Sequence, residues 1–338
     1  MSTKNTPLEN TCLPFQLNNH HFRGRLVRLG SVMDDIIKRH DYPPIVAHML
    51  AETMLLCIAL AGALKYEGIF TLQAKGDGAV SSVVADYTSG GALRGYAMFD
   101  KDRVANEDPG TDATALLLGH GYIAFTVDQG KDTDLYQGIV ELSGRTMADV
   151  VANYFRQSEQ IATGMVVAAK PDADGHWQGG VVILQKMPNH EGAPQYDDSG
   201  NLIINEDDVR RAMLLLGTTT GTELMDAALP GPDLLHRLFH AEGLEVFDPA
   251  PVRDECRCSR ARVERVLRSL TREEIDELAE NNVVDVTCEF CNRHFTFTPD
   301  ALHNLDKVLT LDVPETAPAN RREQILINNK GEHDETRH

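Results

Sequence analysis

Four cysteines near the end of the chain constrain its fold more than any other feature. They form two close pairs, Cys256 with Cys258 and Cys288 with Cys291, and the 29 residues 259–287 separate the pairs. Two thiols one or two residues apart can reach the same tetrahedral cation, and two such pairs complete the four-ligand shell that zinc prefers. The spacing therefore predicts a closed zinc site with no open position for catalysis.

The same thiols are also a candidate redox switch. Zinc holds cysteine sulfur as thiolate, the form that peroxide and disulfides attack, and an oxidised sulfur is a poor ligand. A disulfide within either pair is feasible, although a bridge from Cys256 to Cys258 would be tight. Across all proteins, paired cysteines more often hold zinc permanently than act as a switch. A constitutive zinc-ribbon binding module and a redox switch therefore both stay open.

The region that carries the four thiols, residues 247–309, contains few large apolar residues. Small domains bury a low fraction of their surface and need additional stabilisation. Structural zinc contributes about 10 to 16 kcal/mol of apparent binding energy, whereas whole domains are stable by only about 5 to 15 kcal/mol. We expect this region to unfold when the metal is lost.

Three other residues could take part in thiol or metal chemistry. His294 lies three positions after Cys291 and could replace one thiol, but four cysteines already complete the shell. Cys57 lies on an apolar predicted helix, where a cysteine usually packs as a small hydrophobe. Cys12 lies in a polar leader and is expected to be incidental.

Composition excludes several classes of function. The 338-residue chain is 42% hydrophobic, enough for at least one sizeable core, and its net charge is 32 − 51 = −19. This balance repels nucleic-acid phosphates and anionic membrane surfaces. We therefore expect neither nucleic acid nor a membrane among the partners.

Two segments bear on location. Residues Met1 to Asn10 lack the basic and then apolar pattern of a secretory signal, so we expect a cytoplasmic protein with reduced cysteines. Ile45 to Leu64 is long and apolar enough to suggest a membrane span, but His48 and Glu52 interrupt it. We expect a buried core helix there instead.

Residues 1–188 are predicted to form an α+β domain in which packed helices cover antiparallel strands. A change to period-two hydrophobicity after Gly68, with glycine-rich turns between the runs, indicates hairpins. Strands are expected at Phe22–Leu29, Ile69–Gln73, Ala79–Tyr87, Ala92–Phe99, Tyr122–Asp128, Leu135–Leu142, Met165–Lys170 and Gly179–Lys186, and helices at Ser31–His40, from Pro43-Pro44 onward, and at Thr146–Ser158.

Residues 189–246 are predicted to be a helical linker that depends on its neighbours. Pro188 to Asn205 has a loop composition, and three short helices follow, around Val209–Leu216, at Leu224–Leu229 and from Leu234 to Gly243. Helices of this length are marginal in water unless they pack on another element. This segment should therefore lose its structure easily.

Residues 247–309 are predicted to form the zinc-binding domain, and 310–338 a disordered tail. Between the cysteine pairs, Ser259–Leu270 is expected to be a helix. Thr271-Arg272-Glu273-Glu274 has the pattern of a capping box that opens a second helix through Glu280. Val283–Val286 and His294–Phe297 should form a hairpin around the second cysteine pair.

The sequence contains none of the common nucleotide or nucleophile motifs. A Gly-x4-Gly-Lys-Ser/Thr loop and a Gly-x-Ser-x-Gly elbow are both missing, and the histidines show no metal or acid–base spacing. An ATP-driven machine is therefore not expected, and an enzyme is the weaker class of function.

Taken together, these motifs resemble the 33-kilodalton heat-shock chaperones, a family of redox-regulated holdases. The resemblance covers nearly the whole chain and rests on the two cysteine pairs at the family spacing together with further motifs. Those motifs are Leu72-Gln73-Ala74-Lys75-Gly76-Asp77-Gly78, Arg94-Gly95-Tyr96, Tyr136-Gln137-Gly138-Ile139-Val140 and Tyr154-Phe155-Arg156-Gln157-Ser158-Glu159-Gln160.

The resemblance implies a chaperone that oxidation activates and that needs no ATP. Cys256, Cys258, Cys288 and Cys291 would bind zinc in the reduced, inactive protein, and oxidation would form Cys256–Cys258 and Cys288–Cys291 disulfides. The linker would then unfold, oxidised subunits would pair as homodimers, and unfolding client proteins would be held in solution. The sequence departs from the family in a longer polar tail after about Thr310 and in the acidic segment Asn189–Asp208.

Overall fold

The computed structural model describes residues 8–17, 21–62, 67–106, 110, 114–130, 133, 135–156, 161–187 and 206–303. The chain divides into two compact units. Of these residues, the larger unit contains those up to 259 together with Thr287–His294, and the smaller contains Arg260–Val286 and those from Phe295 onward. The predicted loop at 188–205 and the predicted tail at 310–338 lie outside the described residues.

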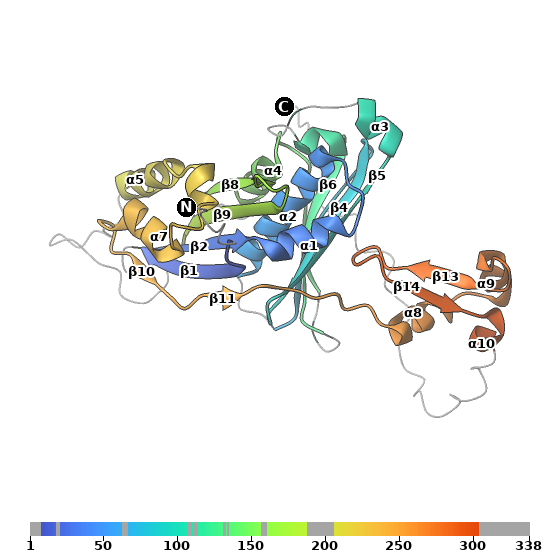
Figure 1. The fold of residues 1–338 in the computed structure, drawn as a ribbon. Coiled ribbons are helices and arrows are strands. Elements are labelled where there is room, and N and C mark those ends of the chain that lie inside the picture. Colours follow the sequence, from blue (N-terminus) through green and yellow to red (C-terminus); the bar gives the residue numbers. More distant parts are fainter. Residues whose placement is uncertain are drawn as a thin grey trace, which may run out of the picture. The chain divides into compact units, whose positions relative to one another are not determined.

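The first of two sheets in the larger unit joins the start of the chain to its middle (Figure 1). Neighbouring strands run in the order β10-β1-β2-β9-β8, and β11 also pairs with β1. In register, Phe22 lies opposite Lys186 and Leu29 opposite Gly179. The strands are β1 (Thr11–Leu17), β2 (Phe22–Leu29), β8 (Thr163–Pro171), β9 (Trp177–Lys186), β10 (Glu245–Val246) and β11 (Ala250–Pro251).

The second sheet of the larger unit is built from consecutive hairpins, with strand order β12-β5-β4-β3-β6-β7. Its pairs are antiparallel except that of β12 with β5, which is parallel. The strands are β3 (Ile69–Gly76), β4 (Val80–Thr88), β5 (Ala92–Phe99), β6 (Gly121–Asp128), β7 (Tyr136–Glu141) and β12 (Arg253–Asp254).

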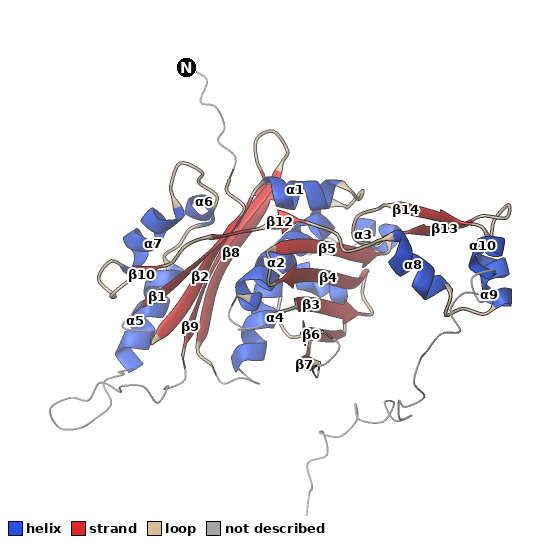
Figure 2. Ribbon diagram, turned by 90° about the horizontal axis from the view of Figure 1, so that it is seen from below, coloured by secondary structure: helices blue, strands red, loops and turns tan. Residues whose placement is uncertain are grey.

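The helix α2 (Pro44–Ala61) packs against strands of both sheets and forms the centre of the main core (Figure 2). It begins after Pro43, as expected for proline at a helix start. It is long and apolar enough to cross a membrane, but 83% of it is buried inside the protein. The prediction of a buried core helix is thus confirmed. The other helices of this core are α1 (Ser31–Lys38), α3 (Lys101–Asn106), η1 (Thr114–Leu118) and α4 (Met147–Tyr154).

Three short helices cover the opposite face of the first sheet and form a second core. They are α5 (Glu206–Gly217), α6 (Gly221–Leu224) and α7 (Gly231–Phe239). The prediction of a helix at Leu224–Leu229 is wrong, because α6 ends at Leu224 and the chain then turns toward Pro230. Thr220 supplies the capping box that starts α6 earlier than predicted.

The expectation that Cys12 lies in a polar leader is also wrong. Cys12 is on β1 and is 5% exposed, and it belongs to the main core. The polar residues around Cys12 gave no strand pattern in the sequence. Strand β1 is recognised by its antiparallel pairing with β2 along its whole length.

The smaller unit has few buried side chains, among them Leu267, Ile275 and Phe297. Thr271 and Glu274 form the predicted capping box at the start of α9. The predicted hairpin is present as the pair β13–β14. The elements are α8 (Arg260–Leu267), α9 (Arg272–Leu278), β13 (Val284–Thr287), β14 (His294–Phe297) and α10 (Pro299–His303), although the last residue of β13 and the first of β14 are counted with the larger unit.

Candidate metal centre

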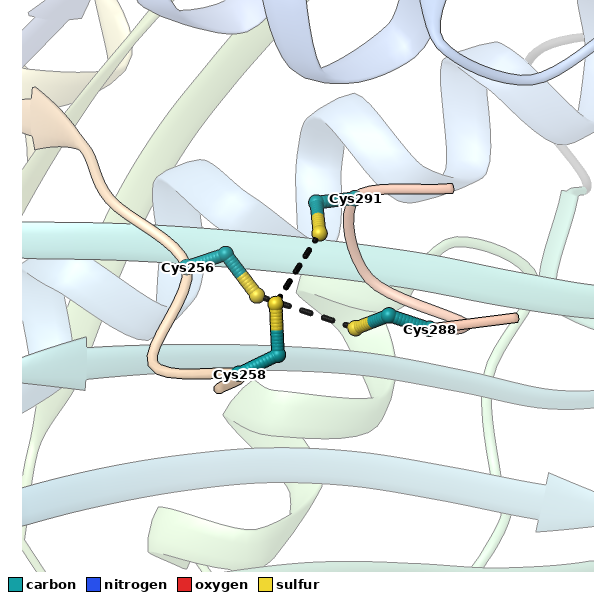
Figure 3. A group of neighbouring side chains, drawn as sticks. All are labelled: Cys256, Cys258, Cys288 and Cys291. Carbon is teal, nitrogen blue, oxygen red and sulfur yellow. Dashed lines mark hydrogen bonds between the residues drawn. The ribbon is translucent and has the colours of Figure 1, made fainter. Parts of the chain in front are cut away.

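The four paired cysteines meet at one point in the larger unit (Figure 3). Their Sγ atoms all lie within 4.8 Å of one another, and each residue is half-buried. The Sγ atoms of Cys256 and Cys288 are 3.7 Å apart, and those of Cys258 and Cys291 are 3.3 Å apart. All four are free thiols. Residues 32 or 33 positions apart in the sequence thus become direct neighbours.

Two local structures position the thiols. The first pair follows β12, which is held against β5 by hydrogen bonds from Arg253 N to Gly91 O and from Glu255 N to Leu93 O. The second pair lies in the turn between β13 and β14. In this turn Cys288 N donates to Arg293 O at 2.9 Å, Asn292 N donates to Cys288 O at 2.8 Å, and Asn292 has a φ of 56°. Asparagine tolerates this left-handed conformation better than most residues.

The sulfur distances fit a four-thiolate shell. Sulfurs at the corners of a tetrahedron with zinc–sulfur bonds of about 2.3 Å would lie roughly 3.8 Å apart. The closest contacts across the two pairs, 3.7 and 3.3 Å, are near this spacing and far longer than a disulfide bond of about 2.05 Å. The four sulfurs could therefore hold a metal ion with little rearrangement.

The electrostatics of the cluster also favour a bound cation. Burial opposes ionisation of Cys256, but hydrogen bonds from the backbone and thiol of Cys258 and from the other thiols outweigh it and lower its pKa to about 7. Burial and hydrogen bonds within the cluster, together with the Cys256 charge, raise the pKa of Cys258. Thiolates packed this closely repel one another, so a full set needs a positive charge among them.

The remaining candidate residues lie outside this cluster. His294 Nδ1 is 3.1 Å from Thr287 Oγ1, and the described metal-ligand cluster does not include it. Cys57 is fully buried on α2, where its thiol lies 3.3 Å from Ala85 O and burial raises its pKa well above the ordinary value. The packing role predicted for Cys57 is confirmed.

Sequence reasoning missed Arg257, the residue between the first two cysteines. Its guanidinium donates a 2.5 Å hydrogen bond to the carboxylate of Asp86 on β4. Asp86 is 4% exposed and also accepts hydrogen bonds from Arg94 at 2.6 and 2.9 Å and from Thr71 at 2.6 Å. One buried carboxylate on β4 therefore joins the thiol segment to β4 and to its neighbours β3 and β5 in the second sheet.

Phe290 lies between Cys288 and Cys291 and contacts the same region of the second sheet as Arg257. Its ring meets that of Tyr96 edge-on at 4.6 Å between centroids, and the Arg94 guanidinium lies 3.7 Å from its centre. Asn292 Nδ2 also donates to Arg39 O at 3.2 Å. Arg94 and Tyr96 belong to one of the sequence motifs that carry the family resemblance. No pattern in the neighbouring residues indicated that these two side chains contact Phe290.

Comparison with known proteins gives consistent results. The family model described as "Hsp33 protein" matches residues 10–298. A protein named 33 kDa chaperonin from Caulobacter vibrioides is 36% identical over 298 residues, covering 86% of this chain and 96% of that protein. A protein of the same name from Escherichia coli is 33% identical over 284 residues, covering 84% of this chain and 90% of that protein.

The fold is also known from a solved structure. The crystal structure of the 33 kDa chaperonin from Thermotoga maritima aligns with a TM-score of 0.72 and 22% sequence identity, covering 88% of this chain and 98% of that one. The predicted α+β architecture with four clustered C-terminal cysteines agrees with this fold.

Proposed function

The chain belongs to the Hsp33 family, and on this basis we propose that it is an ATP-independent holdase chaperone activated by oxidation of its four clustered cysteines. In the reduced state Cys256, Cys258, Cys288 and Cys291 would bind zinc, and the protein would be inactive. The ion would supply the positive charge that keeps four thiolates together. The protein would act in the cytoplasm, without enzymatic activity, on proteins that have begun to unfold.

The observation that carries this proposal is the path of the chain from the helices to the thiols. Between Phe239 at the end of α7 and Cys256 the chain forms only three strands, β10, β11 and β12, of two residues each. They add to the free edges of β1 and β5. Such short pairings have little stability of their own. Loss of the thiol centre would remove the anchor at one end of this path.

The helices at the other end cover a surface suited to unfolded proteins. The α5–α7 helices bury apolar side chains of the first sheet, including Phe15, Phe22, Leu26 and Leu184. An apolar face of this kind, once uncovered, is a typical site for protein contacts. Short helices without their packing partners would not remain folded, so the cover itself is metastable.

Each disulfide, Cys256–Cys258 and Cys288–Cys291, forms when two thiols lose two protons and two electrons. One peroxide molecule accepts both and becomes two molecules of water. Two peroxides would thus convert all four thiols, leaving sulfurs that are poor metal ligands. Pairing of oxidised subunits into homodimers is part of the same proposal, on the strength of the family resemblance.

The test compares zinc-loaded reduced protein with peroxide-treated protein in a light-scattering assay of a chemically unfolded client diluted into buffer without ATP. We expect suppression of aggregation only by the oxidised form, accompanied by zinc release and loss of helix content. Equal activity of the two forms would support a constitutive zinc-binding module instead. If complete metal removal left the helix content equal to that of the zinc-loaded protein, the proposed link between the thiols and α5–α7 would be refuted.

A further inference from the structure

A cavity of about 210 Å³ lies between the two sheets of the larger unit, away from the thiol cluster. One wall comes from β2 and β9 of the first sheet, and the other from β3, β6 and β7 of the second, with the ends of α2 and α4 between them. Its surface is mostly apolar and includes Leu60, Phe70, Phe125, Val127, Phe155 and Met187. Tyr136, which also lines it, is 55% exposed, so the cavity reaches the surface there.

Two arginines interrupt this apolar lining. Arg23 and Arg25 are two residues apart on β2, so both side chains project from the same face of the strand. Arg25 is only 8% exposed, and the Nε of Arg23 is buried without a hydrogen-bond partner. Gln185, which faces Arg23 across the β2–β9 pair, also lines the cavity and is 6% exposed. Arg23, Arg25 and Gln185 are thus neighbours on the wall formed by β2 and β9.

Within the described part of the chain, no carboxylate forms an ion pair with either guanidinium. Burial, together with the neighbouring Arg23, lowers the pKa of Arg25 to about 10, so the Arg25 guanidinium is still a cation at neutral pH. Cys12, close to Arg25, does not neutralise it, because burial raises the pKa of that thiol to about 11. Buried charges are usually paired, so a buried Arg25 beside a half-buried Arg23, with no carboxylate of the described residues on either, is unusual.

The end of α2 offsets part of this charge. A Cβ at Gly62, just after the helix, would lie only 2.5 Å from Arg25 Nε, so glycine allows the guanidinium to approach the helix C-terminus closely. That terminus carries about half a negative charge. The two guanidinium charges therefore exceed the compensation that the described residues provide, and the cavity remains electropositive along its β2–β9 wall.

We propose that this cavity binds an amphipathic monocarboxylate, with its carboxylate on Arg23 and Arg25 and its hydrocarbon tail against Phe70, Phe125 and Val127. Guanidinium groups match the planar carboxylate and bind it through two parallel hydrogen bonds. The remaining wall offers only dispersion and burial, which an alkyl chain satisfies. A cavity of about 150 Å³ holds benzene in another protein, so 210 Å³ suits a tail of medium length. This site is separate from the proposed redox switch.

Calorimetric titration of the full-length, reduced, zinc-loaded protein would test the proposal with four probes. Octanoate is expected to bind one to one. Octanol retains the tail without the charge, octylammonium reverses the charge and acetate lacks the tail, so all three should bind at least tenfold more weakly, which corresponds to about 1.4 kcal/mol. Octanol binding equal to that of octanoate, or no octanoate binding at millimolar concentration, would overturn the proposal.

Variants locate the site. Arg25→Met and Arg23→Met should each weaken octanoate binding at least tenfold while leaving octanol binding unchanged. Arg210→Met, which removes a 72%-exposed arginine on α5, should change neither. Replacement of an unpaired buried cation by an apolar residue should also preserve or raise the melting temperature, so a folded variant is expected. Unchanged octanoate affinity in both cavity variants would rule out the assigned site.

Nuclear Overhauser contacts in the unaltered protein give a check that does not depend on any variant. Octanoate methylene protons should contact the ring protons of Phe125 and Tyr154, which stack at 4.1 Å between centroids beside the cavity. Contacts confined to residues of α5–α7 would place the ligand on the second core and contradict the proposal.

Discussion

Arg257 lies between two cysteines of the thiol cluster and donates a hydrogen bond to Asp86, which is 171 residues earlier in the chain and buried in the second sheet. The carboxylate is shared with Arg94, whose guanidinium also lies against the ring of Phe290 from the other cysteine pair. Each cysteine pair therefore presents one side chain to the same site on the sheet.

Removal of the Arg257 contact should loosen the thiol segment. In Arg257→Gln we expect faster zinc release by peroxide, because the side chain that docks the segment on Asp86 is lost. Charge-assisted hydrogen bonds contribute about 1.5 to 3 kcal/mol. A chromogenic zinc chelator measures the rate. Arg265→Gln, which removes an exposed arginine of α8, is the control, and equal rates in the two variants would contradict the docking role.

Phe290→Leu should weaken the same docking through apolar and cation–π contacts. The ring loses its edge-on contact with Tyr96 and its position beneath Arg94, together about 1 to 2 kcal/mol. Hydrogen exchange of residues 287–294 in the reduced protein should increase accordingly, while that of β3 and β6 should not change. An equal increase in hydrogen exchange in all these segments would show instead that the substitution destabilised the whole unit.

Cys288→Ser tests the ligand assignment. Loss of one thiolate should reduce zinc affinity by more than about 100-fold, because changes to groups outside the ligand shell already reduce affinity about 10- to 100-fold. Metal content after dialysis against a competing chelator measures the effect under reducing conditions. Cys57→Ala should keep its metal, since that thiol is packed inside the core. A fully loaded Cys288→Ser protein would exclude Cys288 as a ligand.

Arg28→Met should release the helices that cover the first sheet. The buried Arg28 donates to Leu229 O at 2.5 Å and to Glu223 O at 2.9 Å, so it joins β2 to the ends of α6 and of the turn that follows. Loss of both bonds should destabilise the α6–α7 segment by about 2 to 4 kcal/mol. Hydrogen exchange of residues 221–239 should rise in the reduced protein. Arg237→Met on the exposed face of α7 is the matched control, and equal exchange in both would refute the anchoring role.

Glu52 should make the stability of the larger unit depend on pH. Burial raises the pKa of this carboxyl from 4.5 to about 7, although Thr114 donates a hydrogen bond to it at 3.2 Å. The folded protein thus retains a proton that the unfolded chain releases above pH 4.5. The associated stability is complete below that pH and is lost as the pH rises through 7.

The Glu52→Gln variant removes this titration. The free energy of unfolding of the variant, minus that of the unaltered protein, should rise by about 2 to 3 kcal/mol from pH 5 to pH 8. Urea unfolding at the two pH values measures the gain. A constant difference between the proteins at both pH values would mean that Glu52 titrates normally.

Local features of the chain could be predicted because they depend on neighbours in sequence. The strand Phe22–Leu29, the capping box at Thr271 and the hairpin of β13 and β14 follow from hydrophobic period and side-chain hydrogen bonding within a few residues. The two cysteine pairs likewise predicted a four-thiol cluster, because their spacing restricts each pair to one side of a small cation.

Other features required the tertiary structure. The pairing of β2 with β9, the burial of Cys12 on β1 and the docking of Arg257 on Asp86 join residues separated by long stretches of chain. Their stability comes from apolar area and charge that many residues bury together, and no local pattern encodes which partners achieve this. Sequence alone thus determined which four thiols cluster and where most elements lie, but it missed β1 and misplaced α6. Only the fold decided that both cysteine pairs meet one buried carboxylate and its arginine, and that Arg23 and Arg25 face an apolar cavity.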